Sequence, residues 1–369
     1  MSETNIEQRL DALGSVQFFR PNKQPTPSER DILPSPEFVR GFVPPDYLWD
    51  GILVRGFTYS LTAKTGVGKT AVGLRLAAHV ALGRALAGRE VRAGRVLMLA
   101  GENPDDVRMR WIALAEQMGF DADEIDVAFR PGVCRISDIM PALYDYAAKF
   151  GDLGLVLVDT SAAYFDGQEE NSNTELGAHA RTLRGLASLP GNPTVLVCCH
   201  PTKNAADDNL QPRGGGAFIA EIDGNLIAKA ADGSIELHWQ GKLRGPDFPP
   251  VMFELSTVES DKLITASGRH IPTVVARALT NSEAISKAIS INADLQHLMS
   301  VMARHPNATV AALATNAGWI LRSGDPHKSK VDRSLKELAA HKLAEKLLGS
   351  KWGLTPKGMK AATQGAKPC

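Results

Sequence analysis

One stretch of the chain, Phe57–Gly73, restricts the fold more than any other. It reads FTYSLTAKTGVGKTAVG, and residues 63–70 match the phosphate-binding loop pattern G-x-x-x-x-G-K-[ST] at every position but the first, which is alanine. The flanks agree with the pattern. Phe57–Leu61 is short and apolar, like a buried strand, and Thr70–Leu82 is rich in alanine, leucine and valine, like a helix. A glycine-rich turn with a chance Lys-Thr is the alternative.

The residue types in this loop suit the binding of a nucleotide's phosphates. Gly66 and Gly68 let the backbone turn tightly and point N–H groups at phosphate oxygens, and the start of the next helix adds partial positive charge. We expect Lys69 to reach the β- and γ-phosphates of ATP, and Thr70 to hold Mg²⁺. The predicted nucleotide-binding residues are Ala63, Lys64, Thr65, Gly66, Val67, Gly68, Lys69 and Thr70.

An acidic residue ends a second apolar run. Gly154–Ser161 reads GLVLVDTS, as in a strand that is buried on both faces and ends in Asp159. We predict that Asp159 emerges beside the phosphate loop and binds Mg²⁺ together with Thr70. The alternative is that Asp159 caps the helix that follows.

Two further apolar strands end in polar side chains. Gly94–Asn103 places Glu102 at its carboxyl end, and Thr194–His200 ends in His200. Ligands of open α/β sheets bind where the carboxyl ends of parallel strands meet. The alternatives are an acidic residue near a helix start for Glu102 and a hydrogen-bonded strand-end histidine for His200. The alternation of strands and helices predicts a mostly parallel sheet with helices on both faces.

The composition is that of a soluble globular protein. Of 369 residues, 44% are hydrophobic and 22% charged, and 41 basic residues balance 41 acidic ones, so any binding of nucleic acid must depend on local patches. The four cysteines form no C-x-x-C pair. No apolar run is long enough to span a membrane and no signal-peptide pattern is present, so we expect a cytoplasmic protein without a membrane partner.

Four segments follow along the chain. Residues 1–45 are polar and rich in proline, which predicts a flexible arm. Residues 46–258 hold the strand and helix patterns described above and form the predicted ATPase domain. Residues 259–290 are weakly patterned and are interpreted as a linker, and residues 291–369 as a C-terminal domain.

The C-terminal segment has the element order of a winged helix-turn-helix domain. Helices are predicted over Ile291–Arg304, Thr309–Ala317 and Pro326–Ala340, and a two-stranded ribbon over His341–Leu354. A basic third helix beside a ribbon suits duplex DNA, and a protein-interaction or oligomerisation domain is the alternative. The residues expected to contact DNA are Lys328, Lys330, Arg333 and Lys336.

Together these motifs resemble the RecA-like P-loop ATPases, and more narrowly the RepA-type hexameric replicative helicases of plasmids and related mobile elements. The resemblance covers roughly Pro44–Leu255. It implies that Glu102 polarises the attacking water and that Asp159 binds magnesium. It also implies that His200 senses the γ-phosphate and relays its presence to loops that contact DNA.

The resemblance further implies a ring of identical subunits, most simply a hexamer. Lys242-Leu243-Arg244 is similar to the Lys-x-Arg pair that reaches a neighbouring subunit's ATP site, and a solvated turn is the alternative. Residues 162–175 and 201–216 correspond to loops that touch single-stranded DNA along a channel. Lys203 and Arg213 are the expected phosphate contacts there.

The sequence therefore predicts an α/β, RecA-like P-loop core followed by a winged-helix domain. The predicted function is an ATP-hydrolysing DNA-binding motor: a ring-forming replicative helicase or replication protein of a plasmid, phage or mobile element. The alternative is an ATP-gated DNA-binding regulator or loader that does not unwind DNA. A third interpretation, a signalling ATPase of the circadian-clock type, is disfavoured by the predicted winged helix.

Overall fold

The computed structural model describes residues 32–151, 153–169, 172–203, 205–206, 209–231, 234–340, 342–347 and 351–364. The chain divides into two units, residues 1–45 and 46–369. Residues 1–31, most of the expected flexible arm, lie outside the described residues. In the rest of the arm, α2 (Ser35–Arg40) is a single short helix with no buried residue.

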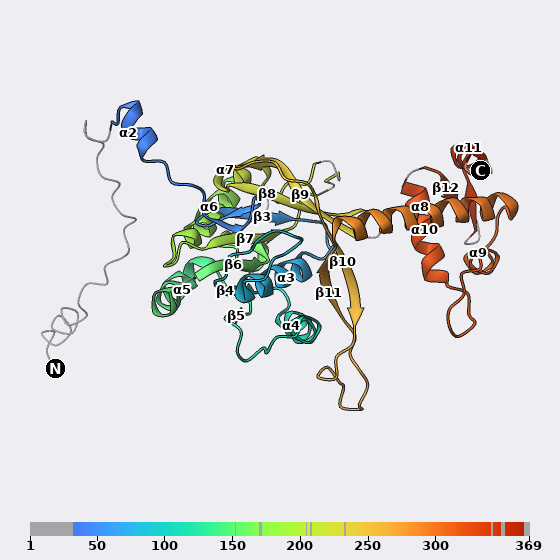
Figure 1. The fold of residues 1–369 in the computed structure, drawn as a ribbon, viewed down its shortest axis with the longest axis horizontal. Helices are drawn as coiled ribbons and strands as arrows, with labels where there is room; N and C mark the ends of the chain where they lie inside the picture. The colour runs from blue at the N-terminus through green and yellow to red at the C-terminus, as the bar shows by residue number, and fades with distance from the viewer. Residues whose placement is uncertain are drawn as a thin grey trace, which may run out of the picture. The chain divides into compact units, whose positions relative to one another are not determined.

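A nine-stranded mixed sheet forms the centre of the second unit (Figure 1), in the order β11-β10-β9-β8-β3-β7-β6-β4-β5. Five neighbouring pairs are parallel and three, between β8 and β11, are antiparallel. A separate hairpin of β1 (Tyr47–Trp49) and β2 (Leu53–Val54) precedes the sheet. The strands of the sheet are β3 (Thr58–Thr62), β4 (Arg95–Ala100), β5 (Val127–Pro131), β6 (Leu153–Asp159), β7 (Thr194–Cys199), β8 (Gly224–Ala231), β9 (Ser234–Leu243), β10 (Val251–Val258) and β11 (Thr273–Ala278).

Alternating residues of the central strands pack into two different cores. On β6, Leu155 and Leu157 face the core of α3 (Lys69–Leu82) and α4 (Pro104–Met118), while Val156 and Val158 face the opposite core. That second core is completed by α5 (Ile136–Phe150), α6 (Asn173–Gly185) and α7 (Gly215–Glu221). The structure thus confirms the α/β fold, with a mostly parallel sheet covered on both faces, as a RecA-like P-loop core has.

Parallel pairing places the functional strand ends at one edge of the sheet. Thr62 on β3 pairs with Cys199 on β7, and Cys198 pairs with Asp159 on β6. Asp159 in turn pairs with Ala100 on β4. Because β7 lies between β3 and β6, the residues that follow all four strands meet along this edge.

The segment expected to be a linker, residues 259–290, is instead largely built into elements. Residues 273–278 form β11, which pairs with β10 and extends the sheet. The helix expected from Ile291 begins ten residues earlier, as α8 (Asn281–Arg304), because Thr280 and Glu283 form a capping box. Neither β10 nor β11 shows the strongly apolar run that distinguishes the central strands.

The C-terminal residues form a separate core of their own. Its elements after α8 are α9 (Val310–Asn316), α10 (Lys328–Ala340), the paired β12 (Ala344–Lys346) and β13 (Trp352–Leu354), and α11 (Pro356–Gln364). Leu298, Leu313 and Leu335 contribute buried side chains from the three expected helices. The element order matches the expectation, and the winged-helix assignment itself stays a prediction. No helix in the described part of the chain has the length and apolarity needed to cross a membrane.

Candidate functional site

The glycine-rich loop joins β3 to the first turn of α3. Gly68 is the N-cap of α3 with φ +113°, and a Cβ there would come within 3.0 Å of Ile235 and 3.1 Å of Leu255, so glycine is required. The Nζ of Lys69 donates to the carbonyl oxygen of Ala63 at 2.9 Å, and the side chain is only 7% exposed. The loop therefore holds its lysine folded back over its own backbone, at the amino end of a 14-residue helix.

Alanine at the first position of the motif fits its surroundings. Ala63 is fully buried in the core shared by β3, α3 and α4, and it is not among the residues with positive φ. Its N–H donates to the carbonyl oxygen of Cys199 at 3.3 Å. The conformation at this position accepts a Cβ, so the departure from glycine leaves the loop intact.

Asp159 ends β6 as a buried carboxylate. It is 4% exposed, and its Oδ1 has no hydrogen-bond partner among the described residues. Burial raises the pKa of this carboxyl, and a hydrogen bond from the side chain of Thr70 opposes the rise. An unpaired buried carboxylate oxygen beside a threonine hydroxyl is a donor set that suits Mg²⁺, so these residues fit the metal that the loop motif implies.

Glu102 and His200 lie together beyond the strand ends. The Oε2 of Glu102 is 3.9 Å from the Nε2 of His200, and the glutamate side chain is 59% exposed. The Nδ1 of His200 lies 3.5 Å from the hydroxyl of Thr65 in the phosphate loop. Burial lowers the pKa of His200, the charge of Lys69 lowers it further, and Glu102 raises it. His200 is therefore predominantly neutral at pH 7.

These side chains share one open cleft with about 1070 Å³ of empty space. It collects residues from the phosphate loop and from the ends of β4, β6 and β7, and others from α4, β10 and β11. Its lining residues are Thr65, Gly66, Gly68, Lys69, Thr70, Glu102, Asn103, Asp106, Val107, Arg110, Asp159, Thr160, His200, Leu255 and Val274.

Comparison with known proteins agrees with this cleft. Residues 24–206 match the profile of the family described as AAA domain. The chain carries a P-loop ATPase domain. No curated protein matches it by sequence. Among solved structures, the ATPase domain of a replicative helicase is similar at a TM-score of 0.43 and 13% identity, covering 54% of this chain and 81% of that one.

Sequence reasoning missed part of the cleft of the ATPase domain. Asp106 and Arg110 follow Glu102 at helical spacing, i and i+4, which was an available signal that they share a face of α4. Leu255 and Val274 come from β10 and β11, and no local pattern connects them with the phosphate loop. Only the folding of these strands onto the sheet edge brings them there.

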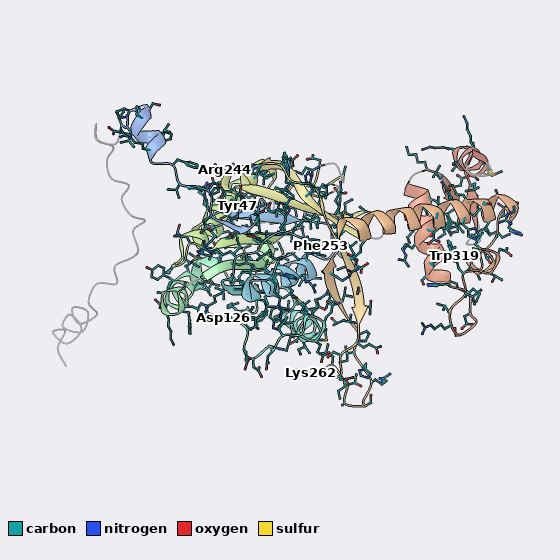
Figure 2. All side chains as sticks on the ribbon, in the orientation of Figure 1. Tyr47, Asp126, Arg244, Phe253, Lys262 and Trp319 are labelled. Atoms are coloured by element: carbon teal, nitrogen blue, oxygen red, sulfur yellow. The ribbon has the colours of Figure 1, made fainter. Side chains whose placement is uncertain are left out.

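Lys242 and Arg244 lie elsewhere in the ATPase domain. The Nη1 of Arg244 donates to Oδ1 of the buried Asp223 at 2.8 Å (Figure 2), and the other oxygen of Asp223 accepts from the N–H of Thr58. Lys242 Nζ donates to the carbonyl oxygens of Ile219 and Ala220 at the end of α7. Thr58 begins β3, so Arg244 lies at the sheet edge opposite its own phosphate loop. Its action on a neighbouring subunit remains a prediction.

The expected DNA-contacting loops flank His200. The N–H of Arg213 donates to the carbonyl oxygen of His200 at 2.9 Å, which ties residues 209–213 to the end of β7. Arg213 and His200 also line a small pocket with Ser161 and Phe165 from the other loop. Lys203 is exposed, and residues 204 and 207–208 of this loop lie outside the described residues.

The four basic residues expected on α10 differ in their surroundings. Lys330 Nζ forms an ion pair with Oδ2 of Asp294 at 2.8 Å and lies 4.4 Å from the centre of the Trp319 ring (Figure 2 labels Trp319). Lys328, Arg333 and Lys336 are exposed. Contact with DNA stays a prediction for all four, and Lys330 has a structural role in addition.

Proposed function

We propose that the chain is an ATP-hydrolysing DNA-binding motor: a ring-forming replicative helicase or replication protein of a plasmid, phage or mobile element. The observation that carries the proposal is the meeting of Lys69, Thr70, Asp159, Glu102 and His200 in one cleft. Three strand ends and a helix start supply these groups, as phosphoryl transfer from a nucleotide requires.

The proposed chemistry assigns one task to each group. Lys69, freed from the carbonyl oxygen of Ala63, neutralises charge that develops on the β- and γ-phosphate oxygens. Glu102, mostly exposed to the cleft, orients the attacking water and accepts its proton. Asp159 and Thr70 hold Mg²⁺, whose charge offsets that of the phosphates when it is bound.

In this proposal His200 connects hydrolysis with DNA. Its ring lies between Glu102 and Thr65, where a γ-phosphate would be bound, and its carbonyl oxygen accepts from the N–H of Arg213. A change at the phosphate thus has a direct path to the loop that carries Lys203 and Arg213. Those side chains, with the basic face of α10, would neutralise DNA phosphates.

The ring assembly and the role of Arg244 in trans belong to the same proposal. One observation favours the alternative, an ATP-gated DNA-binding regulator or loader. Arg244 is already engaged by Asp223 within its own subunit, and an arginine that stays there leaves the neighbour's site without its finger. Hydrolysis would then be slow, which suits a switch better than a motor.

Strand displacement on a forked DNA duplex separates the two functions. The full chain is expected to release the labelled strand with ATP and Mg²⁺, but not with a non-hydrolysable ATP analogue. Lys69→Ala protein should release none under either condition. ATP hydrolysis by the wild-type chain without strand release, at protein concentrations that saturate the DNA, would support the regulator instead.

A further inference from the structure

An apolar side chain is left uncovered at one wall of the cleft. On β10, Val251 and Phe253 point into the core beside α3 and α4 (Phe253 is labelled in Figure 2), and Leu255 is the next residue on that face. The core ends before it, so Leu255 is 37% exposed although it packs against the N-cap of α3. Val274 lies on the same face, because Leu255 pairs with Ala276, two residues from Val274.

The opposite wall is α4, and an arginine joins it to this strand pair. The Nε of Arg110 donates to Oδ2 of Asp106 at 2.6 Å, and its Nη1 donates to the carbonyl oxygen of Val274 at 3.0 Å. Asn103 uses its side-chain oxygen to accept from the N–H of Asp106 at the start of α4. Each polar side chain at this end of the cleft is therefore bonded to the protein itself.

The two ends of the cleft differ in chemistry. Lys69, Thr70 and Asp159 supply charge and hydroxyl groups at one end, and Glu102 and His200 lie beyond them. Leu255 and Val274 supply an apolar surface at the other end. A nucleoside triphosphate whose phosphates occupy the loop has to place its base and sugar in the remaining space, against this surface.

We propose that Leu255 and Val274 form the nucleobase subsite, and that it holds the base by apolar contact without reading its hydrogen-bonding edge. The substrate class is then nucleoside triphosphates in general. Strong discrimination needs buried polar groups that only the correct base satisfies. None of the buried unpaired polar atoms among the described residues belongs to Asn103, Asp106 or Arg110. This inference rests on the proposed nucleotide-hydrolysing function.

Competition binding on the full chain tests the proposal. A fluorescent ATP analogue is displaced by ATP, GTP, CTP or UTP, each with Mg²⁺, and by inorganic triphosphate. We expect the four nucleotides to compete within about tenfold of one another, as apolar contact allows. A preference for ATP of roughly 100-fold or more over every other base would overturn the inference and leave the hydrolytic function standing. Failure of all five competitors to bind would overturn both.

Leu255→Ala provides the second arm. Loss of the apolar contact is expected to weaken binding of all four nucleotides by a similar factor, roughly tenfold, and to leave binding of inorganic triphosphate unchanged. Ile264→Ala is the matched control, because Ile264 is 53% exposed on the loop between β10 and β11 and lines no part of the cleft. Equal loss of inorganic triphosphate binding in Leu255→Ala would contradict a base-binding role.

Arg110 is a positioning residue in this scheme. Arg110→Ala should let β11 separate from α4, raising the KM for every nucleotide while kcat at saturation stays near the wild-type value. Arg110→Lys retains one donor and should recover part of the KM. A fall in kcat with unchanged KM would show that Arg110 acts on the reacting phosphates, and would overturn this assignment.

Discussion

Among single side chains, Asp159 shows most directly that the site is built at a cost to stability. Burial raises the pKa of its carboxyl, so the ionised form is less stable in the folded chain than in the unfolded one. Asp159→Asn removes the charge. We expect the variant without nucleotide to unfold a few degrees above the wild type in a thermal melt. It should also lose the further stabilisation that Mg²⁺-ATP gives to the wild type.

The sign of this effect fixes its pH dependence. At a pH below the ordinary carboxyl pKa, about 4, Asp159 is protonated whether the chain is folded or unfolded, and no penalty arises. As the pH rises through the raised folded pKa, the wild type alone loses stability. The advantage of Asp159→Asn should therefore grow from about pH 4 to pH 7. An advantage that is constant with pH would contradict burial of the charge as its cause.

Glu102 is the side chain whose proposed role is purely chemical. Its carboxylate is exposed and makes no bond that holds the fold. Glu102→Gln should bind Mg²⁺-ATP with nearly unchanged affinity and hydrolyse it about 10²- to 10⁴-fold more slowly, because an amide accepts a proton poorly. Single-turnover kinetics measures this directly, and Glu116→Gln, exposed at the far end of α4, is the matched control. Loss of ATP binding would mark Glu102 as structural.

Among whole elements, α10 tests which lysines serve DNA and which serve the fold. Arg333→Ala with Lys336→Ala removes two exposed charges, so duplex affinity should fall and the salt dependence of binding should lose roughly two counterions. Lys330→Ala breaks the ion pair with Asp294 and the contact with Trp319. Its main effect should be a lower melting temperature. Duplex affinity that is the same in the double variant and the wild type would favour a protein-contact role for this segment.

The elements also show how far sequence reasoning reaches. The phosphate loop, β4, β6 and β7 were predictable, because strands buried on both faces are continuous apolar runs that end in polar residues. β10 and β11 were not. Each has one half-exposed face and carries polar residues such as Glu254 and Arg277. Their pairing depends on contacts between distant parts of the chain, so the wall that holds Leu255 and Val274 could not be foreseen.

For the molecule as a whole, Arg244 decides whether the site is completed by a second subunit. It is held by Asp223 within its own chain, so Arg244→Ala should lower thermal stability in any case. If it also acts in trans, mixing Arg244→Ala with Lys69→Ala protein should restore part of the ATPase activity that neither has alone. The reason is that one type of interface then pairs an intact loop with an intact arginine. No recovery, with subunit exchange verified, would confine Arg244 to its internal ion pair.

The central claim is that hydrolysis takes place in the cleft around Lys69 and is coupled to DNA. The steady-state rate of ATP hydrolysis by the purified full chain, with and without single-stranded DNA, measures it most directly. We predict turnover that rises when DNA is added, and none for Lys69→Ala in either condition. Lys149→Ala, on the exposed side of α5, should behave as the wild type does. Wild-type turnover by Lys69→Ala protein would contradict the assignment of this cleft.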